Sequence, residues 1–494
     1  MQNVNPANLY ALLPDAWLML AVVVAWLVDT FFGDASRKVT AAIALFSTLI
    51  AAVWYGALAM DPHTYYFFTN MYVVDPFANL MKAFVTLAYA VTIIYSRTYL
   101  EERDLFRADY YLLGMFSLLG QLVMISGNNF LTLYLGLELM SLSLYAVIAL
   151  RKTSPVANEA AMKYYVLGAI ASGFLLYGIS MVYGGTGSLD LGEVFRAISS
   201  GRIDTAVLLF GVIFIVAGIA FKMGAVPFHM WVPDVYQGAP TAMTLLVGGG
   251  PKLAAFSWGV RFLVVGLLPL AVDWQQMLVI LAALSLIVGN ITGIVQRNVK
   301  RMLAYSAIAN MGFVLLGLLS GVIDGKALGA ADSYGSATFY GITYLLTTLG
   351  TFGIVMLISR RDFEADNIDD LKGLSKRNPL FALMMTLFMF SLAGIPPLVG
   401  FTAKLSVLSA TMNAGLTWLT VLAVITSLFG AFYYLRIVKL MWFDEPLDTT
   451  PLETTLCARA FLIVNGLLTL VLGMFPGPLM TLCQHTLQLS FFKL

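Results

Sequence analysis

Apolar stretches of about 20 residues follow one another along almost the whole chain, and this pattern constrains the fold strongly. A helix needs about 20 residues to cross the hydrocarbon core of a bilayer, where backbone polar groups must be satisfied within the protein. Of the 494 residues, 60% are hydrophobic and only 11% are charged, whereas a soluble domain is about a quarter charged. The sequence therefore predicts an all-α polytopic membrane protein.

Fourteen apolar stretches are predicted to be membrane spans, and two of them are too long for a single crossing. The two long stretches, 205–238 and 379–413, contain Pro227 and the pair Pro396-Pro397. Proline donates no N–H and clashes with the preceding turn, so we expect both stretches to form broken helices. The other predicted spans are 10–32, 38–60, 72–95, 109–126, 128–150, 160–184, 241–269, 274–296, 299–321, 333–358, 417–440 and 456–478.

Lysine and arginine are unevenly distributed between the two sides of the predicted bundle. Because cytoplasmic connections carry the excess of these residues, we expect the odd-numbered connections in the cytoplasm and both termini on the opposite side. The odd-numbered connections and their flanks hold Arg37, Lys38, Arg97, Arg103, Arg107, Arg151, Lys152, Arg297, Lys300, Arg301, Arg360, Arg361, Lys372, Lys376, Arg377, Arg436, Lys439 and Arg459. The even-numbered connections and the termini hold Arg196, Arg202, Lys326 and Lys493.

The two broken spans are five spans apart, which predicts an internal repeat. Because five is odd, the second copy of a five-span unit lies inverted in the membrane, as in many transporters. We therefore expect an N-terminal three-helix segment (1–108), a first repeat (109–269), an inverted second repeat (270–440) and a C-terminal helix (441–494). The longest cytoplasmic connection, Ser359–Asn378, is polar and is interpreted as a surface loop or short helix that could contact a neighbour.

Composition excludes several classes of function. The formal net charge is +1, which argues against nucleic acid as a partner. The two cysteines, Cys457 and Cys483, form no paired motif, and the sequence contains no phosphate-binding loop, dinucleotide fingerprint, or haem or metal spacing. We therefore expect no cofactor in this chain. Energy for any pumping must then come from a partner or from an ion gradient.

Glu138 and Lys222 are the first pair of charged residues expected deep in the membrane. Glu138 lies ten residues into its span, which at 1.5 Å per residue is roughly 15 Å deep. An acid at this depth is by default a functional hypothesis, here a proton-carrying site. If Lys222 faces Glu138, opening and closing of the pair would release and reload a proton. The alternative is a static ion pair that only holds helices together.

Two further lysines are expected near mid-depth. Lys252 lies about eleven residues into its span, with no acid on its own helix, so its partner must be water, a hydroxyl or a group on another helix. Lys404 follows the second proline break, whose freed carbonyls water can solvate. A desolvated lysine gives up its proton more readily than one in water, so Lys252 suits a proton relay, and Lys404 suits a terminal site before release to one side. The alternatives are that Lys252 snorkels and that Lys404 only satisfies the freed carbonyls.

Four other charged residues are less constrained by the sequence. Lys163 follows Glu159 by four residues. This spacing fits a solvated surface ion pair as well as it fits a functional lysine. His229, just after the first break, has a side chain suited to proton transfer or to a structural hydrogen bond. Lys82 and Arg261 are left without a role, and either could snorkel to the membrane surface.

Five segments together resemble the antiporter-like proton-channel subunits of respiratory complex I and their relatives in Mrp antiporters and membrane-bound hydrogenases. The resemblance extends over nearly the whole chain. The absence of a long lateral C-terminal helix argues against the L-like branch. Lys404 argues against the M-like branch, which carries an acid there, and the N-like branch remains. The segments are Asn129–Glu138 (NFLTLYLGLE), Phe221–His229 (FKMGAVPFH), Trp231–Pro240 (WVPDVYQGAP), Asn298–Ser306 (NVKRMLAYS) and Ser391–Lys404 (SLAGIPPLVGFTAK).

The resemblance implies a proton-translocating subunit of NADH:quinone oxidoreductase in a bacterial inner membrane. By resemblance, Glu138 and Lys222 are the coupling pair and Lys163 modulates it. Lys252 is then the central relay, Lys404 the residue of the distal channel, and His229 part of the connecting path. The implied partners are J-, K- and M-like subunits and the lateral helix of an L-like subunit. NADH, FMN, iron–sulfur clusters and quinone are expected in partner subunits.

Three alternatives stay open at this stage. A subunit of an Mrp-type Na⁺/H⁺ antiporter or of a membrane-bound hydrogenase would carry similar residues. A channel or carrier for an organic solute would need a roomy polar pocket at mid-depth, whereas the sequence offers only single charges. A purely structural membrane spacer would have no need of four charges near mid-depth.

Overall fold

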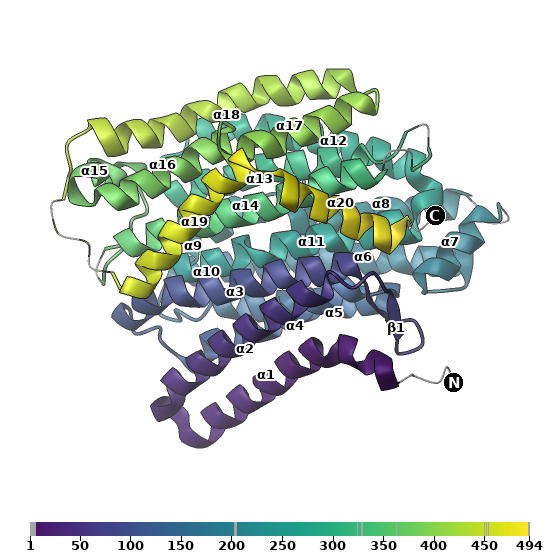
Figure 1. Cartoon of the computed structure of the whole chain (residues 1–494), viewed down its shortest axis with the longest axis horizontal. Coiled ribbons are helices and arrows are strands. Elements are labelled where there is room, and N and C mark those ends of the chain that lie inside the picture. Colours follow the sequence, from purple (N-terminus) through teal and green to yellow (C-terminus); the bar gives the residue numbers. More distant parts are fainter. Residues whose placement is uncertain are drawn as a thin grey trace.

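A computed structural model describes residues 6–201, 205–323, 325–327, 330–361, 363–448, 450, 452 and 454–492. Arg202 and Lys493, counted above, lie outside these residues. The described chain is a bundle of helices, with α1 and α2 along one edge and α17 and α18 along the opposite edge (Figure 1). The start of the first helix and the end of the last lie at the same end of the bundle.

The predicted all-α membrane fold is confirmed. Within the described residues, twelve helices are long and apolar enough to cross a membrane. The other two expected spans, 241–269 and 379–413, are each divided into shorter helices. The twelve are α1 (Leu13–Phe32), α2 (Arg37–Leu58), α3 (Pro76–Glu102), α4 (Ala108–Ser126), α5 (Phe130–Ile148), α6 (Pro155–Thr186), α8 (Thr205–Met223), α12 (Ala271–Ile294), α13 (Val299–Leu319), α14 (Ala330–Ile358), α18 (Thr417–Phe443) and α19 (Leu456–Met474).

The remaining elements are shorter. The pieces of broken spans are α9 (Trp231–Gly238), α10 (Thr241–Gly248), α11 (Gly250–Val260) with a π-helical turn (Arg261–Gly266), α16 (Pro379–Ala393) and α17 (Val399–Asn413). The predicted spans did not include α7 (Leu191–Ser199), α15 (Leu374–Arg377), most of α20 (Gly477–Phe491) or β1 (Tyr65–Phe67). β1 pairs in an antiparallel hairpin with β2 (Tyr72–Val74), which occupies the first residues of the predicted span 72–95. Short 3₁₀ turns cover Pro6–Leu12, Gly33–Ser36, Leu268–Leu270 and Ile368–Leu371.

The ends of the helices follow from local sequence. Asp75, Asn298 and Asn378 precede α3, α13 and α16, and the side chain of each accepts a hydrogen bond from a first-turn N–H. These caps satisfy donors that the helix leaves unpaired. Proline follows the cap of α3 and of α16, where its missing N–H costs nothing.

Helices α4 and α5 pack closely where glycines face each other. A Cβ on Gly120 of α4 would lie 2.4 Å from the backbone nitrogen of Met140, and a Cβ on Gly136 of α5 would lie 2.7 Å from that of Met124. Membrane helices associate through such close backbone contact, because lipid supplies little hydrophobic driving force. The most enclosed helix is α14, whose apolar segment is 100% buried, against 28% for α19.

Lys82 and Arg261, for which the sequence left snorkelling open, are both buried in ion pairs. The side chain of Lys82 is 0% exposed, and its Nζ lies 3.0 Å from the carboxylate of Asp15. Arg261 is 2% exposed and its Nη2 lies 2.7 Å from the carboxylate of Asp75. Both cations are buried because an acid from another part of the chain reaches them, which removes the need to reach water.

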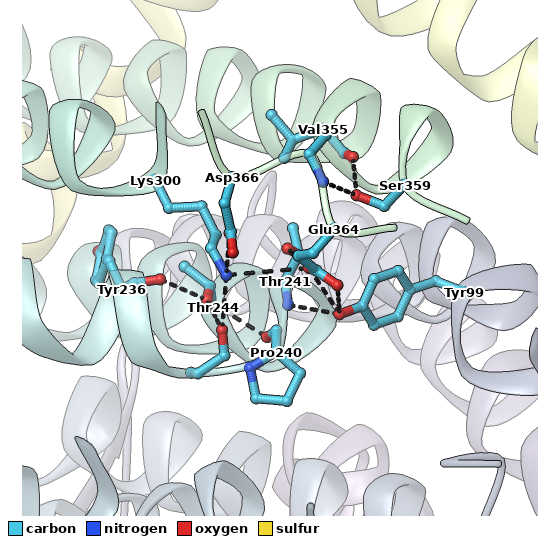
Figure 2. Close-up of polar contacts among 12 residues, drawn as sticks. Tyr99, Tyr236, Pro240, Thr241, Thr244, Lys300, Val355, Ser359, Glu364 and Asp366 are labelled. Carbon is cyan, nitrogen blue, oxygen red and sulfur yellow. Dashed lines mark hydrogen bonds and ion pairs between the residues drawn. The ribbon is translucent and has the colours of Figure 1, made fainter. Parts of the chain in front are cut away.

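The connection Ser359–Asn378 contains short helices, as expected, but it also sends one carboxylate inward. Figure 2 shows Lys300 and Tyr99 approaching Glu364 from opposite sides. The Tyr99 hydroxyl donates to Glu364 at 2.8 Å, Arg103 Nε donates at 3.3 Å, and Lys300 Nζ lies 3.9 Å away. The surface-loop interpretation missed this cluster because its partners come from α3 and α13, far away in sequence.

Two more residues complete this cluster, which we call the Glu364 latch: Tyr99, Arg103, Thr241, Lys300, Glu364 and Asp366. Thr241 at the start of α10 donates its hydroxyl to Glu364, and Lys300 lies 3.0 Å from Asp366 (Figure 2). Burial raises the pKa of Glu364, but Lys300, the Thr241 hydroxyl and Arg103 lower it more, so the net pKa lies below the ordinary value. The latch therefore joins three transmembrane regions through an ionised carboxylate.

Candidate functional site

Both predicted helix breaks are present. α8 ends at Met223 and α9 begins at Trp231, while α16 ends at Ala393 and α17 begins at Val399. A glycine in the left-handed region follows each first half: Gly224 has φ +74° and Gly394 has φ +85°. Glycine adopts this conformation without a Cβ penalty, so each helix ends as a glycine-capped helix does.

Each break binds a lysine ammonium at the same place. Lys252 of α11 donates to the carbonyl of Met223 at 2.8 Å. Lys404 of α17 donates to the carbonyls of Leu392 and Ala393 at 2.9 and 3.0 Å. The last carbonyls of a helix lack intrahelical partners and carry the negative end of its dipole, so they attract a cation.

Glycine is needed at positions 224 and 394 for two reasons. The backbone has a positive φ there, and an added Cβ would collide with the lysine side chain. A Cβ on Gly224 would lie 2.8 Å from Lys252 Nζ, and a Cβ on Gly394 would lie 2.9 Å from Lys404 Cδ. A side chain at either position would push the ammonium away from the carbonyls. The two breaks are therefore built alike, although their lysines come from different elements.

Lys222 is held by a serine that the sequence analysis did not single out. Its Nζ donates to the hydroxyl of Ser141 at 2.7 Å, and the lysine is 4% exposed. Ser141 in turn donates to the carbonyl of Leu137 at 2.6 Å. Among the described residues, nothing donates a hydrogen bond to Glu138 Oε1, which is buried. Among the described residues, Lys222 forms no ion pair with Glu138; it is held instead by Ser141, which lies three residues from Glu138 and so on the same face of α5.

An aromatic pair lies beside both lysines of the first break. The rings of Tyr164 and Trp231 stack with centroids 4.4 Å apart and planes at 17°. Lys222 Nζ is 5.5 Å from the Tyr164 ring, and Lys252 Nζ is 4.7 Å from the Trp231 ring. Trp231 is fixed by a hydrogen bond from its Nε1 to the carbonyl of Phe221 at 2.8 Å. Cation–π contacts of this kind stabilise desolvated ammonium groups.

The second break has a corresponding aromatic pair. Phe313 stacks on Tyr340 with centroids 5.5 Å apart, and Lys404 Nζ lies 5.2 Å from the Phe313 ring. The hydroxyl of Ser427 accepts a third hydrogen bond from Lys404 at 2.9 Å. Sequence reasoning had no signal for Ser427 or Phe313, because neither lies near Lys404 along the chain.

Lys163 and His229 lie apart from this chain of hydrogen bonds. The Lys163 side chain is 43% exposed and pairs with Glu159 and Asp234, both at 2.8 Å. Arg301 also pairs with Asp234, at 2.7 Å. The Nδ1 atom of His229 is buried and has no hydrogen-bond partner among the described residues. Lys163 is therefore joined to α9 by its ion pair with Asp234.

The described residues contain no group of three histidine, cysteine, aspartate or glutamate side chains placed to hold a metal ion. They do contain Lys222, Lys252 and Lys404, three lysines that lie at the two helix breaks and are held by hydroxyls or carbonyls. This arrangement defines a class: polytopic helical membrane proteins whose broken helices present carbonyls to buried lysines, as in ion-coupled transporters.

The comparisons with known proteins define the family. The family model for NADH:quinone oxidoreductase/Mrp antiporter membrane regions matches residues 127–430. A protein of Paraburkholderia phymatum named NADH-quinone oxidoreductase subunit N is 72% identical over 99% of this chain and 100% of its own length. One of Cupriavidus taiwanensis with the same name is 59% identical over 96% and 97%. The chain belongs to the NADH:quinone oxidoreductase/Mrp antiporter family, in its subunit N group.

Solved structures confirm the fold. A chain of respiratory complex I from Thermus thermophilus superposes with a TM-score of 0.81 at 30% identity, covering 95% of this chain and 98% of that one. A chain of the Mrp complex from Dietzia has a TM-score of 0.84 at 20% identity, covering 97% of both chains. At 20% identity the second likeness shows the fold alone.

Proposed function

We propose that this chain is a proton-translocating membrane-arm subunit of NADH:quinone oxidoreductase, and that protons pass along its buried lysines. One observation carries the proposal: Lys222, Lys252 and Lys404 are held by hydroxyls or carbonyls. Among the described residues, none of the three has a carboxylate within 4.0 Å. Loss of a proton from such a lysine leaves a neutral, hydrogen-bonded amine and no stranded buried anion, which is what a relay requires.

We assign each charged residue one role in proton transfer. Glu138 and Lys222 form the coupling pair with Ser141 between them, Lys252 is the central relay, and Lys404 belongs to the distal channel. His229 lines the connecting path. Lys163 modulates the first break through Asp234 on α9. Movement of Glu138 toward or away from Ser141 would bias the proton on Lys222, which makes the pair a two-state element.

The surroundings of the chain belong to the same proposal. Residues 109–269 and 270–440 form the two inverted repeats, between an N-terminal segment (1–108) and a C-terminal helix (441–494). The chain lies in a bacterial inner membrane with both termini on the periplasmic side. Its neighbours are J-, K- and M-like subunits and the lateral helix of an L-like subunit. Redox chemistry from NADH to quinone takes place in partner subunits and supplies the energy.

The relatives favour this function over an Mrp-type antiporter or a hydrogenase subunit. Proteins up to 72% identical along the full chain carry the name NADH-quinone oxidoreductase subunit N. The Mrp chain is 20% identical and so supports no more than a shared fold.

The test is the pair of variants Lys222→Ala and Lys222→Arg in the assembled complex. Arginine keeps the positive charge but does not give up a proton, so both variants should lose proton pumping together with coupled electron transfer. NADH:quinone electron transfer, pumping and assembly are measured in the same native membranes. The matched control is Lys439→Arg, at a lysine whose side chain is 60% exposed. A normal proton yield in Lys222→Arg would show that Glu138 and Lys222 have only a structural role, which contradicts the proposal.

A further inference from the structure

Among the described residues, no hydrogen bond connects Lys252 at the first break with Lys404 at the second break. The interval between these two lysines is therefore a gap in the proposed proton path. Helix α14 (Ala330–Ile358), whose apolar segment is 100% buried, contributes residues to this interval. A proton passing between the two breaks must therefore pass groups of α14.

Two small cavities lie in this interval. The first has a volume of about 10 Å³ and is lined by Lys252, Gly249, Met311, Gly341 and Tyr344, among others. The second, also about 10 Å³, is lined by Tyr344, Asn310, Tyr340, Thr347, Ser391 and Leu392, among others. A cavity needs roughly 10–15 Å³ to hold one water, so each is of the size of a single water molecule.

Tyr344 is the one residue that lines both cavities. It is 7% exposed, and it lies on the face of α14 between the two breaks. The second cavity lies beside the site of Lys404: its lining residue Leu392 accepts a hydrogen bond from Lys404 Nζ through its carbonyl, at 2.9 Å. A buried water needs two to four polar partners, and the hydroxyl and amide side chains of the second cavity offer them.

We propose that Tyr344 bridges the two breaks, with one water on each side of its hydroxyl. The proposal rests on the proposed function. Lys252 gives a proton to the first water, which passes one to the Tyr344 oxygen. The hydroxyl releases its own proton to the second water, and the neutral amine of Lys404 takes up the last one. One N–H bond breaks, one forms, and each oxygen ends with as many O–H bonds as it had.

The first test is Tyr344→Phe in the assembled complex, which removes the hydroxyl and keeps the ring. Coupled pumping should fall by about tenfold or more, since positioned proton transfer contributes roughly 10²–10⁴-fold. The matched control is Tyr334→Phe on the same helix, where a buried hydroxyl has no hydrogen-bond partner among the described residues and lines neither cavity. This control should pump normally. Normal pumping in Tyr344→Phe would overturn the bridge.

The second test does not depend on activity or on a variant that assembles. A high-resolution cryo-EM map of the unmodified complex should show two ordered waters within hydrogen-bond distance of the Tyr344 hydroxyl, one toward Lys252 and one toward Leu392. Absence of either water overturns the proposal. If Lys222→Arg abolishes pumping but Tyr344→Phe does not, the bridge fails while the proposed function stands. If Lys222→Arg pumps normally, the proposed function itself fails.

Discussion

Two regions of this protein bury cations, and they do so in opposite ways. In the central chain, Lys222, Lys252 and Lys404 are held by hydroxyls and backbone carbonyls. Toward the N-terminal helices, Lys82 and Arg261 are each held by a carboxylate, at 3.0 and 2.7 Å. Both groups are largely or fully removed from water, so burial alone does not distinguish a relay from a structural pair.

The chemical nature of the hydrogen-bond partner distinguishes a relay lysine from a structural ion pair. A cation that gives up its proton in an ion pair leaves a lone buried anion, which is very costly, so the pair stays charged and fixed. A cation held by neutral acceptors leaves nothing charged behind. The first kind of site stabilises the fold, and the second kind is free to change its protonation state.

The largest expected effect on stability is at Asp75, the carboxylate partner of Arg261. Asp75→Asn keeps the cap on α3 but leaves the 2% exposed guanidinium without its anion. Removal of one partner of a buried pair costs about 3–5 kcal/mol. We expect a large loss of assembled complex on native gels and a lower Tm, with a normal proton yield in whatever assembles. The control is Asp444→Asn, at an exposed ion pair with Lys439. Loss of pumping at normal stability would break the comparison.

A smaller effect is expected at Glu364 of the Glu364 latch, a residue that lies outside the membrane spans. Glu364→Gln removes the charge facing Lys300 and Arg103, which should cost about 1.5–3 kcal/mol. Since the folded pKa of Glu364 is lowered, the stabilisation is complete above the unfolded pKa of about 4.3 and is lost as pH falls through the folded value. Thermal melts should therefore show a gap between wild type and variant that is constant near neutrality and closes in acid. A gap independent of pH would contradict this assignment.

The smallest expected effect on stability is at Ser141. Ser141→Ala removes the hydroxyl that accepts from Lys222, and should cost about 1 kcal/mol, because one neutral partner contributes little net stability. Pumping should fall far more than stability, since Lys222 loses the hydroxyl that holds its ammonium group. Ser141→Thr, which restores a hydroxyl, should recover pumping. Equal losses of stability and pumping would place Ser141 with the structural pairs.

The sequence was sufficient for the positions of the two helix breaks. Pro227 and Pro396-Pro397 act on the helix in which they lie, so their effect could be predicted locally. The expected depth of Glu138 and Lys252 followed from counting residues into a span. These features need no knowledge of what packs beside them.

The partners of those charges could not be predicted in the same way. Lys252 binds the backbone carbonyl of Met223, and a carbonyl has no signature in the side-chain sequence. Lys82 and Arg261 find acids 67 and 186 residues away, so only the tertiary fold brings them together. Ser141 was within reach of sequence reasoning, because it lies one helical turn from Glu138.

The Glu364 latch has a consequence for how this chain is made. Tyr99 and Glu364 are 265 residues apart, and Thr241 also needs Glu364. At roughly 5–20 residues per second of synthesis, the ribosome takes about 13–53 s to supply the acid after Tyr99 has entered the membrane. The first half of the chain therefore leaves the translocon before Glu364 is available to accept hydrogen bonds from Arg103 and Thr241. Glu364 can bind Tyr99 and Thr241 only after eleven spans have been inserted. A chain truncated before Glu364 therefore lacks the carboxylate that holds α3 and α10 together.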